Sequence, residues 1–197
     1  MSSYATPYVA QIDGLRAIAI IWVVAFHYFP EFFAGGYIGV DVFFVISGYL
    51  ISGIIWNQLD KDAFSFIEFY RRRIRRIFPA LLTVLITCLV LGFLFLHNPE
   101  YRQLAKHVFA SSLFLNNWAL SIDKGYFDVA SENKPLLHLW SRSIEEQFYL
   151  IWPLLLWSFA AFFKQKKNWI TAILILGAMS LLACLIQTPV RPIGSFY

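Results

Sequence analysis

The chain has 197 residues, of which 59% are hydrophobic and 14% charged, whereas soluble domains carry about 25% charged residues. A soluble domain of this length could not bury so much apolar surface, and the composition also excludes disordered, collagen-like and coiled-coil proteins. The formal net charge of +4 is unevenly spread, because five arginines lie between positions 71 and 76. We predict an all-α, polytopic membrane helical bundle with about five spans plus one re-entrant or weak helix.

The first predicted span runs from about Ile12 to Pro30 and carries Asp13, Arg16 and His27. Arg16 and His27 are separated by about three helical turns and therefore share one face, with Asp13 on the same stripe. Ionisable groups in a span usually face a bundle interior or a wet cavity, and an imidazole can take and return a proton near neutral pH. The alternative, that Arg16 snorkels to the interface and His27 is an interface residue, is left open by the spacing.

The second predicted span, Tyr37 to Trp56, carries one charge, Asp41. Gly48 and Ser52 form a pair of small residues one turn apart, which favours close approach of a neighbouring helix. We interpret the glycines of this span as packing residues.

The arginine run directly precedes the third predicted span, Ile77 to Leu96. Juxtamembrane arginines most often set topology and anchor lipid headgroups. The other interpretation is a clamp for a cytosolic anionic ligand, because guanidinium groups pair bidentately with phosphate oxygens. The positive-inside rule places the N-terminus and the arginine run in the cytoplasm.

The segment Leu104 to Ile122 is a weak span, because polar residues interrupt it (Lys106, His107, Asn116 and Asn117). A second basic loop at Lys164, Lys166 and Lys167 would also be cytoplasmic. An even number of spans must then separate the two basic loops, and counting residues 104–122 as a full span would make that number odd. We therefore interpret this segment as re-entrant or interfacial.

A polar stretch leads into the next predicted span, Gln147 to Phe163, and a last span follows from Trp169 to Gln187. Ser141 and Glu145 are four residues apart and lie on one helix face. The alternative is that Ser141 is an N-cap and the acidic residues complement the helix dipole. We expect no soluble domain, and the end of the chain soon after a span indicates an incomplete chain.

Four of these stretches, taken together and in this order, resemble the acyltransferase 3 family of membrane O-acyltransferases that modify bacterial carbohydrates. Arg16 and His27 match its Arg-x10-His signature, and the stretch Trp140 to Tyr149 resembles its Ser-x-x-x-Glu motif. The other two matches are Gly39 to Gly48, like the second-helix motif, and Arg72 to Arg76, like the cytoplasmic arginine motif. Arg142 stands where an apolar residue is more usual. The resemblance covers residues 1–197 and implies the N-terminal part of a membrane domain of about ten spans.

The resemblance implies transfer of an acyl group, commonly acetyl from cytosolic acetyl-CoA, to a hydroxyl of a cell-surface or lipid-linked carbohydrate such as lipopolysaccharide or peptidoglycan. It implies a location in the bacterial cytoplasmic (inner) membrane. The expected partners are the acyl-CoA, the glycan acceptor and membrane lipids. No permanently bound cofactor, metal site or nucleic-acid partner is expected.

The resemblance also assigns roles to residues. His27 would be the general base or acyl relay, and Arg16, paired with Asp13, would orient the donor or stabilise charge at the carbonyl. Ser141 and Glu145 would line the site near the acceptor. The CoA phosphates would be held by Arg72, Arg73, Arg75 and Arg76.

Two other classes remain compatible with the sequence. The polar spans could form a transporter or channel module whose intramembrane charges bind a solute or relay protons. The chain could also be an inactive fragment of the acyltransferase. Hydrolysis of acetyl-CoA, or its protection of the protein from labelling, separates the enzyme from a transporter.

Overall fold

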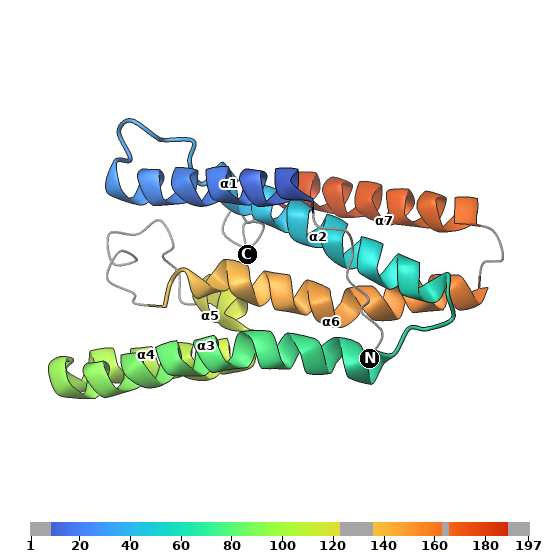
Figure 1. The fold of residues 1–197 in the computed structure, drawn as a ribbon. Coiled ribbons are helices and arrows are strands. Elements are labelled where there is room, and N and C mark those ends of the chain that lie inside the picture. The colour runs from blue at the N-terminus through green and yellow to red at the C-terminus, as the bar shows by residue number, and fades with distance from the viewer. Residues whose placement is uncertain (1–8, 123–135, 163–165, 189–197) are drawn as a thin grey trace. The chain divides into compact units, whose positions relative to one another are not determined.

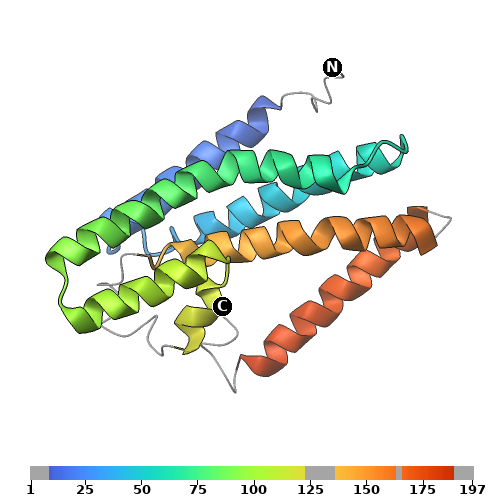
Figure 2. The same ribbon diagram turned by 90° about the horizontal axis from the view of Figure 1, so that it is seen from below.

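The computed structural model describes residues 9–122, 136–162 and 166–188, without the side chains of residues 166 and 167. Every regular element within these ranges is an α-helix (Figures 1 and 2). Four helical stretches there are long and apolar enough to cross a membrane: 10–28, 38–59, 66–95 and 168–187. The all-α membrane bundle predicted from the sequence is therefore confirmed. The chain divides into two compact units, residues 1–64 and 65–197, each of which is described by itself.

The first unit is a helical hairpin of α1 (Ala10–Tyr28) and α2 (Ile38–Leu59), joined by a short turn. The two helices pack closely at Gly39, where a Cβ atom would lie 2.5 Å from the carbonyl oxygen of Ala19 and 2.7 Å from Val23 Cγ2. Any larger residue would force the two backbones apart. This close approach lies at the first turn of α2, at a different position from the Gly48 and Ser52 pair for which the sequence predicted it.

The second unit begins with α3 (Phe66–Phe95), a helix of 30 residues. The Ser65 hydroxyl caps its start by accepting from the Glu68 N–H at 3.4 Å. Thirty residues of helix are about 45 Å long, whereas the hydrocarbon core of a bilayer is about 30 Å thick. The arginine run and the predicted span thus form one continuous helix, whose N-terminal turns extend beyond the apolar core.

The weak segment 104–122 is broken into α4 (Asn98–Ser112) and α5 (Asn116–Ile122). The break contains Phe114 with a φ of 56°, a left-handed conformation that ends a helix. α4 turns back along α3, as Figure 2 shows, and a buried apolar cluster lies in this part of the unit (Leu81, Leu85, Leu104, Val108 and Leu136). Neither α4 nor α5 is among the stretches able to span a membrane, as the sequence predicted for this segment.

The last two helices are α6 (Leu139–Phe162) and α7 (Lys166–Gln187). α6 has 24 residues, but its first turns carry Arg142, Glu145 and Glu146, and it is not among the four stretches suited to crossing a membrane. The predicted span Gln147–Phe163 corresponds to the charge-free remainder of α6. Lys164 lies outside the described residues.

Candidate active site

Asp13 and Arg16 form an ion pair in the first turns of α1. Arg16 Nη1 donates to Asp13 Oδ1 at 3.3 Å, and the two side chains are 32% and 49% exposed. An ion pair this exposed contributes little to stability. The carboxylate instead limits the directions in which the guanidinium points, leaving its remaining N–H groups for another acceptor.

His27 lies in the last turn of α1 with its ring held in one orientation. Its Nδ1 is 2.7 Å from the carbonyl oxygen of Val23, and Phe26 packs edge-on against the ring at a centroid distance of 5.4 Å. A carbonyl oxygen only accepts hydrogen bonds, so Nδ1 carries the proton in the neutral ring. The basic lone pair of the neutral imidazole is therefore on Nε2, the nitrogen farther from the helix backbone.

Arg16 and His27 lie on the same face of α1 because the helix is continuous between them. Eleven residues at 1.5 Å each place their backbones about 16 Å apart along the helix axis. Long helical side chains lean toward the N-terminus, so Arg16 leans away from His27 rather than toward it. The geometry therefore favours a role for Arg16 on another part of an extended ligand, rather than beside the atom that His27 reaches.

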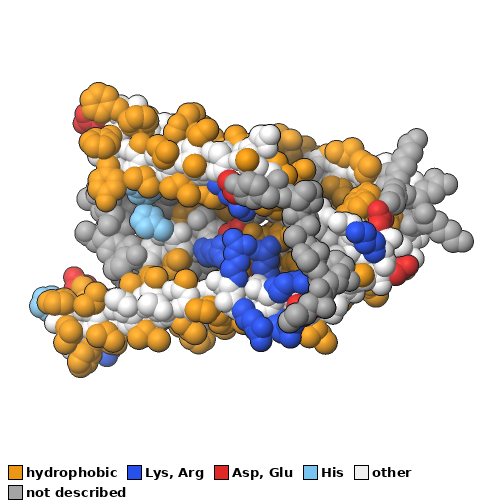
Figure 3. All heavy atoms as spheres, viewed as in Figure 1, with side chains coloured by type: hydrophobic (Ala, Val, Ile, Leu, Met, Phe, Trp, Pro, Cys, Tyr) orange, Lys and Arg blue, Asp and Glu red, His pale blue; other side chains and the backbone are white. Residues whose placement is uncertain are grey.

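The five arginines of α3 are not equivalent. Arg71 and Arg72 both pair with Glu68, with Arg72 at 3.4 Å. Arg75 and Arg76 are exposed and make no ion pair with any described residue. Figure 3 shows basic side chains gathered over α3 on one face. This exposed group can bind an anion.

Arg73 differs from its neighbours because its side chain is half-buried. Its guanidinium carbon lies 4.2 Å from the ring centroid of Tyr149 in α6 and 5.8 Å from that of Phe69. Both distances are within the range of cation–π attraction. Arg73 thus contacts the α6 polar cluster rather than extending with the exposed arginines.

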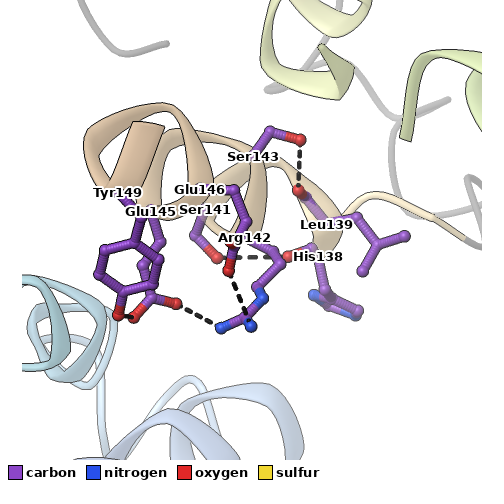
Figure 4. Close-up of polar contacts among 8 residues, drawn as sticks. All are labelled: His138, Leu139, Ser141, Arg142, Ser143, Glu145, Glu146 and Tyr149. Carbon is purple, nitrogen blue, oxygen red and sulfur yellow. Dashed lines mark hydrogen bonds and ion pairs between the residues drawn. The ribbon is translucent and has the colours of Figure 1, made fainter. Parts of the chain in front are cut away.

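The α6 polar cluster consists of Arg142, Glu145, Glu146 and Tyr149. Arg142 Nη1 donates to Glu145 Oε2 at 2.5 Å, and the Tyr149 hydroxyl donates to the other oxygen of the same carboxylate. Arg142 Nη2 is also 2.9 Å from Glu146 Oε1, an electrostatic contact without hydrogen-bond alignment. Figure 4 shows Glu145 between Arg142 and Tyr149. The arginine that departs from the usual motif therefore pairs with both adjacent glutamates.

Ser141 is not an N-cap. α6 begins at Leu139, and the Ser141 hydroxyl donates to the carbonyl of His138 at 3.3 Å instead of accepting from a backbone N–H. The helix starts earlier because the turn at Leu136 already supplies carbonyls to Leu139 and Trp140. Ser141 and Glu145 lie one turn apart on α6, as their spacing predicts.

A buried polar network joins α4, α5 and α6, and the sequence did not assign it. The Asn116 side chain, fully buried, donates to the carbonyl of Leu136 at 2.9 Å, and its Oδ1 lies 3.1 Å from His107 Nδ1. Its backbone N–H donates to Ser143 Oγ at 3.3 Å. Gln147 adds a bond to Asn117 at 2.9 Å. The sequence carries a signal for this network, namely the polar residues inside the apolar segment 104–122. Burying such groups is costly unless they hydrogen-bond, so they are expected to bond to one another.

Neither unit offers a metal centre within the described residues, where no group of three or more His, Cys, Asp or Glu side chains is placed to hold an ion. The polar groups present are a histidine base, exposed guanidinium groups and a carboxylate pair in contact with an arginine. These groups suit proton transfer and anion binding.

The fold and the site together define a polytopic helical membrane protein with ionisable side chains on its membrane helices. In such proteins these charges usually mark functional sites. The family model for the acyltransferase domain, acyltransferase 3, matches residues 9–197. The chain therefore belongs to the acyltransferase 3 family, and the resemblance inferred from the four motifs is confirmed.

Curated relatives extend this result. The chain is 41% identical over 179 residues to the peptidoglycan O-acetyltransferase OatA of Listeria monocytogenes, and 37% identical over 181 residues to the O-acetyltransferase OatA of Staphylococcus aureus. Each match covers 90% of this chain but 29% of the relative. An uncharacterised protein of Haemophilus influenzae is 42% identical over 118 residues, which are 59% of this chain and 48% of that protein. No solved structure matches.

Proposed function

We propose that the protein transfers an acetyl group from acetyl-CoA to a hydroxyl of an envelope carbohydrate, with peptidoglycan as the acceptor. The observation that carries this proposal is His27, whose Nδ1–H is fixed on the Val23 carbonyl and whose basic lone pair is on Nε2. Membership of the acyltransferase 3 family supports the reaction type. The names of the relatives, peptidoglycan O-acetyltransferase and O-acetyltransferase, support the acetyl group and the acceptor.

In the proposed reaction the acceptor hydroxyl oxygen bonds to the thioester carbonyl carbon. His27 Nε2 takes the hydroxyl proton as this bond forms. The tetrahedral intermediate then collapses, the carbon–sulfur bond breaks, and CoA leaves as the thiol with the proton that His27 returns. The same histidine thus acts first as a base and then as an acid, with no net change in its protonation.

Arg16 orients the donor in this scheme. Its backbone is about 16 Å from that of His27 along the helix, a spacing that suits contacts with two separate parts of an elongated acyl-CoA. Asp13 directs the guanidinium by pairing with it at 3.3 Å.

The exposed arginines of α3 bind the phosphates of the donor. Arg72, Arg75 and Arg76 are exposed, and planar guanidinium groups pair bidentately with phosphate oxygens. Their density exceeds what a topological signal requires. Arg73 has different surroundings and is treated separately below.

Ser141 and Glu145 lie near the acceptor in the proposed site. Both occupy the first turns of α6, where a hydroxyl and a carboxylate offer hydrogen bonds to sugar hydroxyls. We further propose that the N-terminus is cytoplasmic, because the turn 29–36 lacks Lys and Arg while residues 61–76 are basic. The protein would then lie in the bacterial cytoplasmic membrane with its arginines on the side of the cytosolic donor.

The test combines donor consumption with product analysis. Membranes carrying the natural protein are given acetyl-CoA, and release of the CoA thiol is measured. In parallel, base-labile acetate is quantified in peptidoglycan and in lipopolysaccharide from cells with and without the gene. We expect gene-dependent thiol release and loss of acetate from peptidoglycan. Loss from lipopolysaccharide alone would overturn the acceptor, and unchanged acetate in both would overturn the transfer reaction.

A further inference from the structure

The starting observation is that one arginine of the α3 run is turned away from the others. Arg72, Arg75 and Arg76 are exposed, whereas Arg73 is half-buried with its guanidinium over the ring of Tyr149 at 4.2 Å. A guanidinium held over a ring by cation–π attraction loses the freedom to follow a mobile phosphate. The run therefore contains two kinds of arginine in different surroundings.

Tyr149 connects Arg73 to a proposed acceptor-site residue. Tyr149 is only 5% exposed, and its hydroxyl donates to Glu145 Oε1. A cation over the ring draws electron density from the phenol, which makes its hydroxyl a stronger donor. The contacts form a chain from the Arg73 guanidinium through the Tyr149 ring and hydroxyl to the Glu145 carboxylate.

The two carboxylates of the α6 polar cluster lie in a mostly buried site that favours cationic neighbours. The Glu145 and Glu146 side chains are only 17% and 9% exposed, and Arg142 lies 2.5 Å and 2.9 Å from them. Burial raises the pKa of Glu146 to about 7, whereas the positive charges of Arg142 and Arg73 act to lower it. Arg73 is therefore a second cation that favours the ionised form of this carboxylate pair.

Two further contacts hold α3 and α6 in register around Arg73. The Tyr70 hydroxyl donates to the carbonyl oxygen of Leu150 at 2.8 Å, and Phe66 packs edge-on against Trp157 at 5.9 Å between centroids. These contacts lie on the N-terminal side of Arg73. The placement of its guanidinium on Tyr149 is therefore part of a series of contacts rather than an isolated one.

We propose that Arg73 and Tyr149 are positioning residues for Glu145, so that the arginine run serves two sites. The exposed arginines bind the donor, and Arg73 fixes the carboxylate that meets the acceptor. This inference rests on the proposed function. It separates Arg73 from the phosphate-binding arginines, among which the resemblance in sequence had included it.

The test separates kcat from the KM for acetyl-CoA in membranes carrying the natural protein. Arg73→Gln and Tyr149→Phe should each lower kcat at least tenfold, with the KM for acetyl-CoA within about twofold of wild type. Arg73→Lys should recover part of the kcat, because an ammonium also binds over a ring face. The matched control, Arg75→Gln, should raise the KM for acetyl-CoA and leave kcat nearly unchanged. The double variant Arg73→Gln/Tyr149→Phe should be no slower than Arg73→Gln alone, because both act through one carboxylate.

Two results would overturn the proposal while leaving the proposed function intact. One is a rise in the KM of Arg73→Gln equal to that of Arg75→Gln. The other is a wild-type kcat for Tyr149→Phe, which removes one hydroxyl and tests the proposal even where Arg73→Gln does not accumulate. Absence of turnover in the wild-type protein would instead overturn the proposed function, and this inference with it.

Discussion

The replacement Asn116→Ala tests whether the buried network holds α4, α5 and α6 together. The Asn116 side chain is 0% exposed and makes two of the network's contacts, to His107 and to the carbonyl of Leu136. Its backbone bond to Ser143 does not depend on the side chain. The substitution therefore removes two defined hydrogen bonds and leaves two buried polar groups without this partner.

The expected loss follows from those two bonds. A net hydrogen bond contributes about 1 kcal/mol, and a buried group left without its partner costs about 1–3 kcal/mol. We therefore expect Asn116→Ala to lower the free energy of unfolding by about 2–4 kcal/mol. For a chain of this size each kcal/mol corresponds to about 2–4 °C, so Tm should fall by roughly 5–15 °C.

Cys88 provides the assay. It is partly buried against the apolar cluster of Leu81, Leu85 and Leu104, whereas Cys184 is exposed. In a Cys184→Ser background, a fluorogenic thiol dye reports the opening of this cluster as the detergent-solubilised protein is heated. Gln103→Ala, at an exposed position of α4, is the matched control and should change stability by less than about 0.5 kcal/mol. Equal Tm values for the Asn116 and Gln103 variants would refute the reasoning.

The remaining predictions concern helix packing and donor binding. Gly39→Val should lower the amount of folded protein in membranes, because its first added carbon meets the Ala19 carbonyl at 2.5 Å, whereas Gly53→Val, with no atom within 4 Å of that carbon, should not. Equal abundance of the two variants on membrane immunoblots would contradict the close approach. Replacing the three exposed donor-binding arginines of α3 with lysine should keep the topology and weaken acetyl-CoA binding at least tenfold, or about 1.4 kcal/mol. Donor affinity is measured beside a topology reporter inserted at residues 163–165. Unchanged affinity with unchanged topology would show that these arginines only anchor the chain.

Local spacing was sufficient to predict the geometry of α1. Arg16 and His27 lie on one face because the helix runs without interruption between them, and helical periodicity then fixes their directions. The break between α4 and α5 was also predictable. A span with His107 and Asn116 inside it could not face lipid, so its polar groups indicated a segment that does not cross.

The contacts between helices were not predictable from spacing. Arg73 and its arginine neighbours look alike in the sequence, and only the packing of α3 against α6 places Arg73 on Tyr149. The same holds for Asn116, whose partner Ser143 belongs to a different helix. The N-cap interpretation of Ser141 was wrong because the preceding turn had already started the helix. Arg142, which departs from the usual motif, is a different case, because Glu145 and Glu146 follow it by three and four residues on one helix, where such side chains are neighbours.

The most direct test of the central claim is acetyl transfer by a His27→Ala variant of the natural protein. Acetate esters on peptidoglycan are measured beside the amount of the variant in membranes. Because alanine removes the Nε2 lone pair, we predict loss of the esters to the level of cells lacking the gene, with the protein still inserted. His27→Tyr, which would preserve an interface anchor, should be equally inactive. Normal acetylation in His27→Ala would contradict the assignment of His27 as the base.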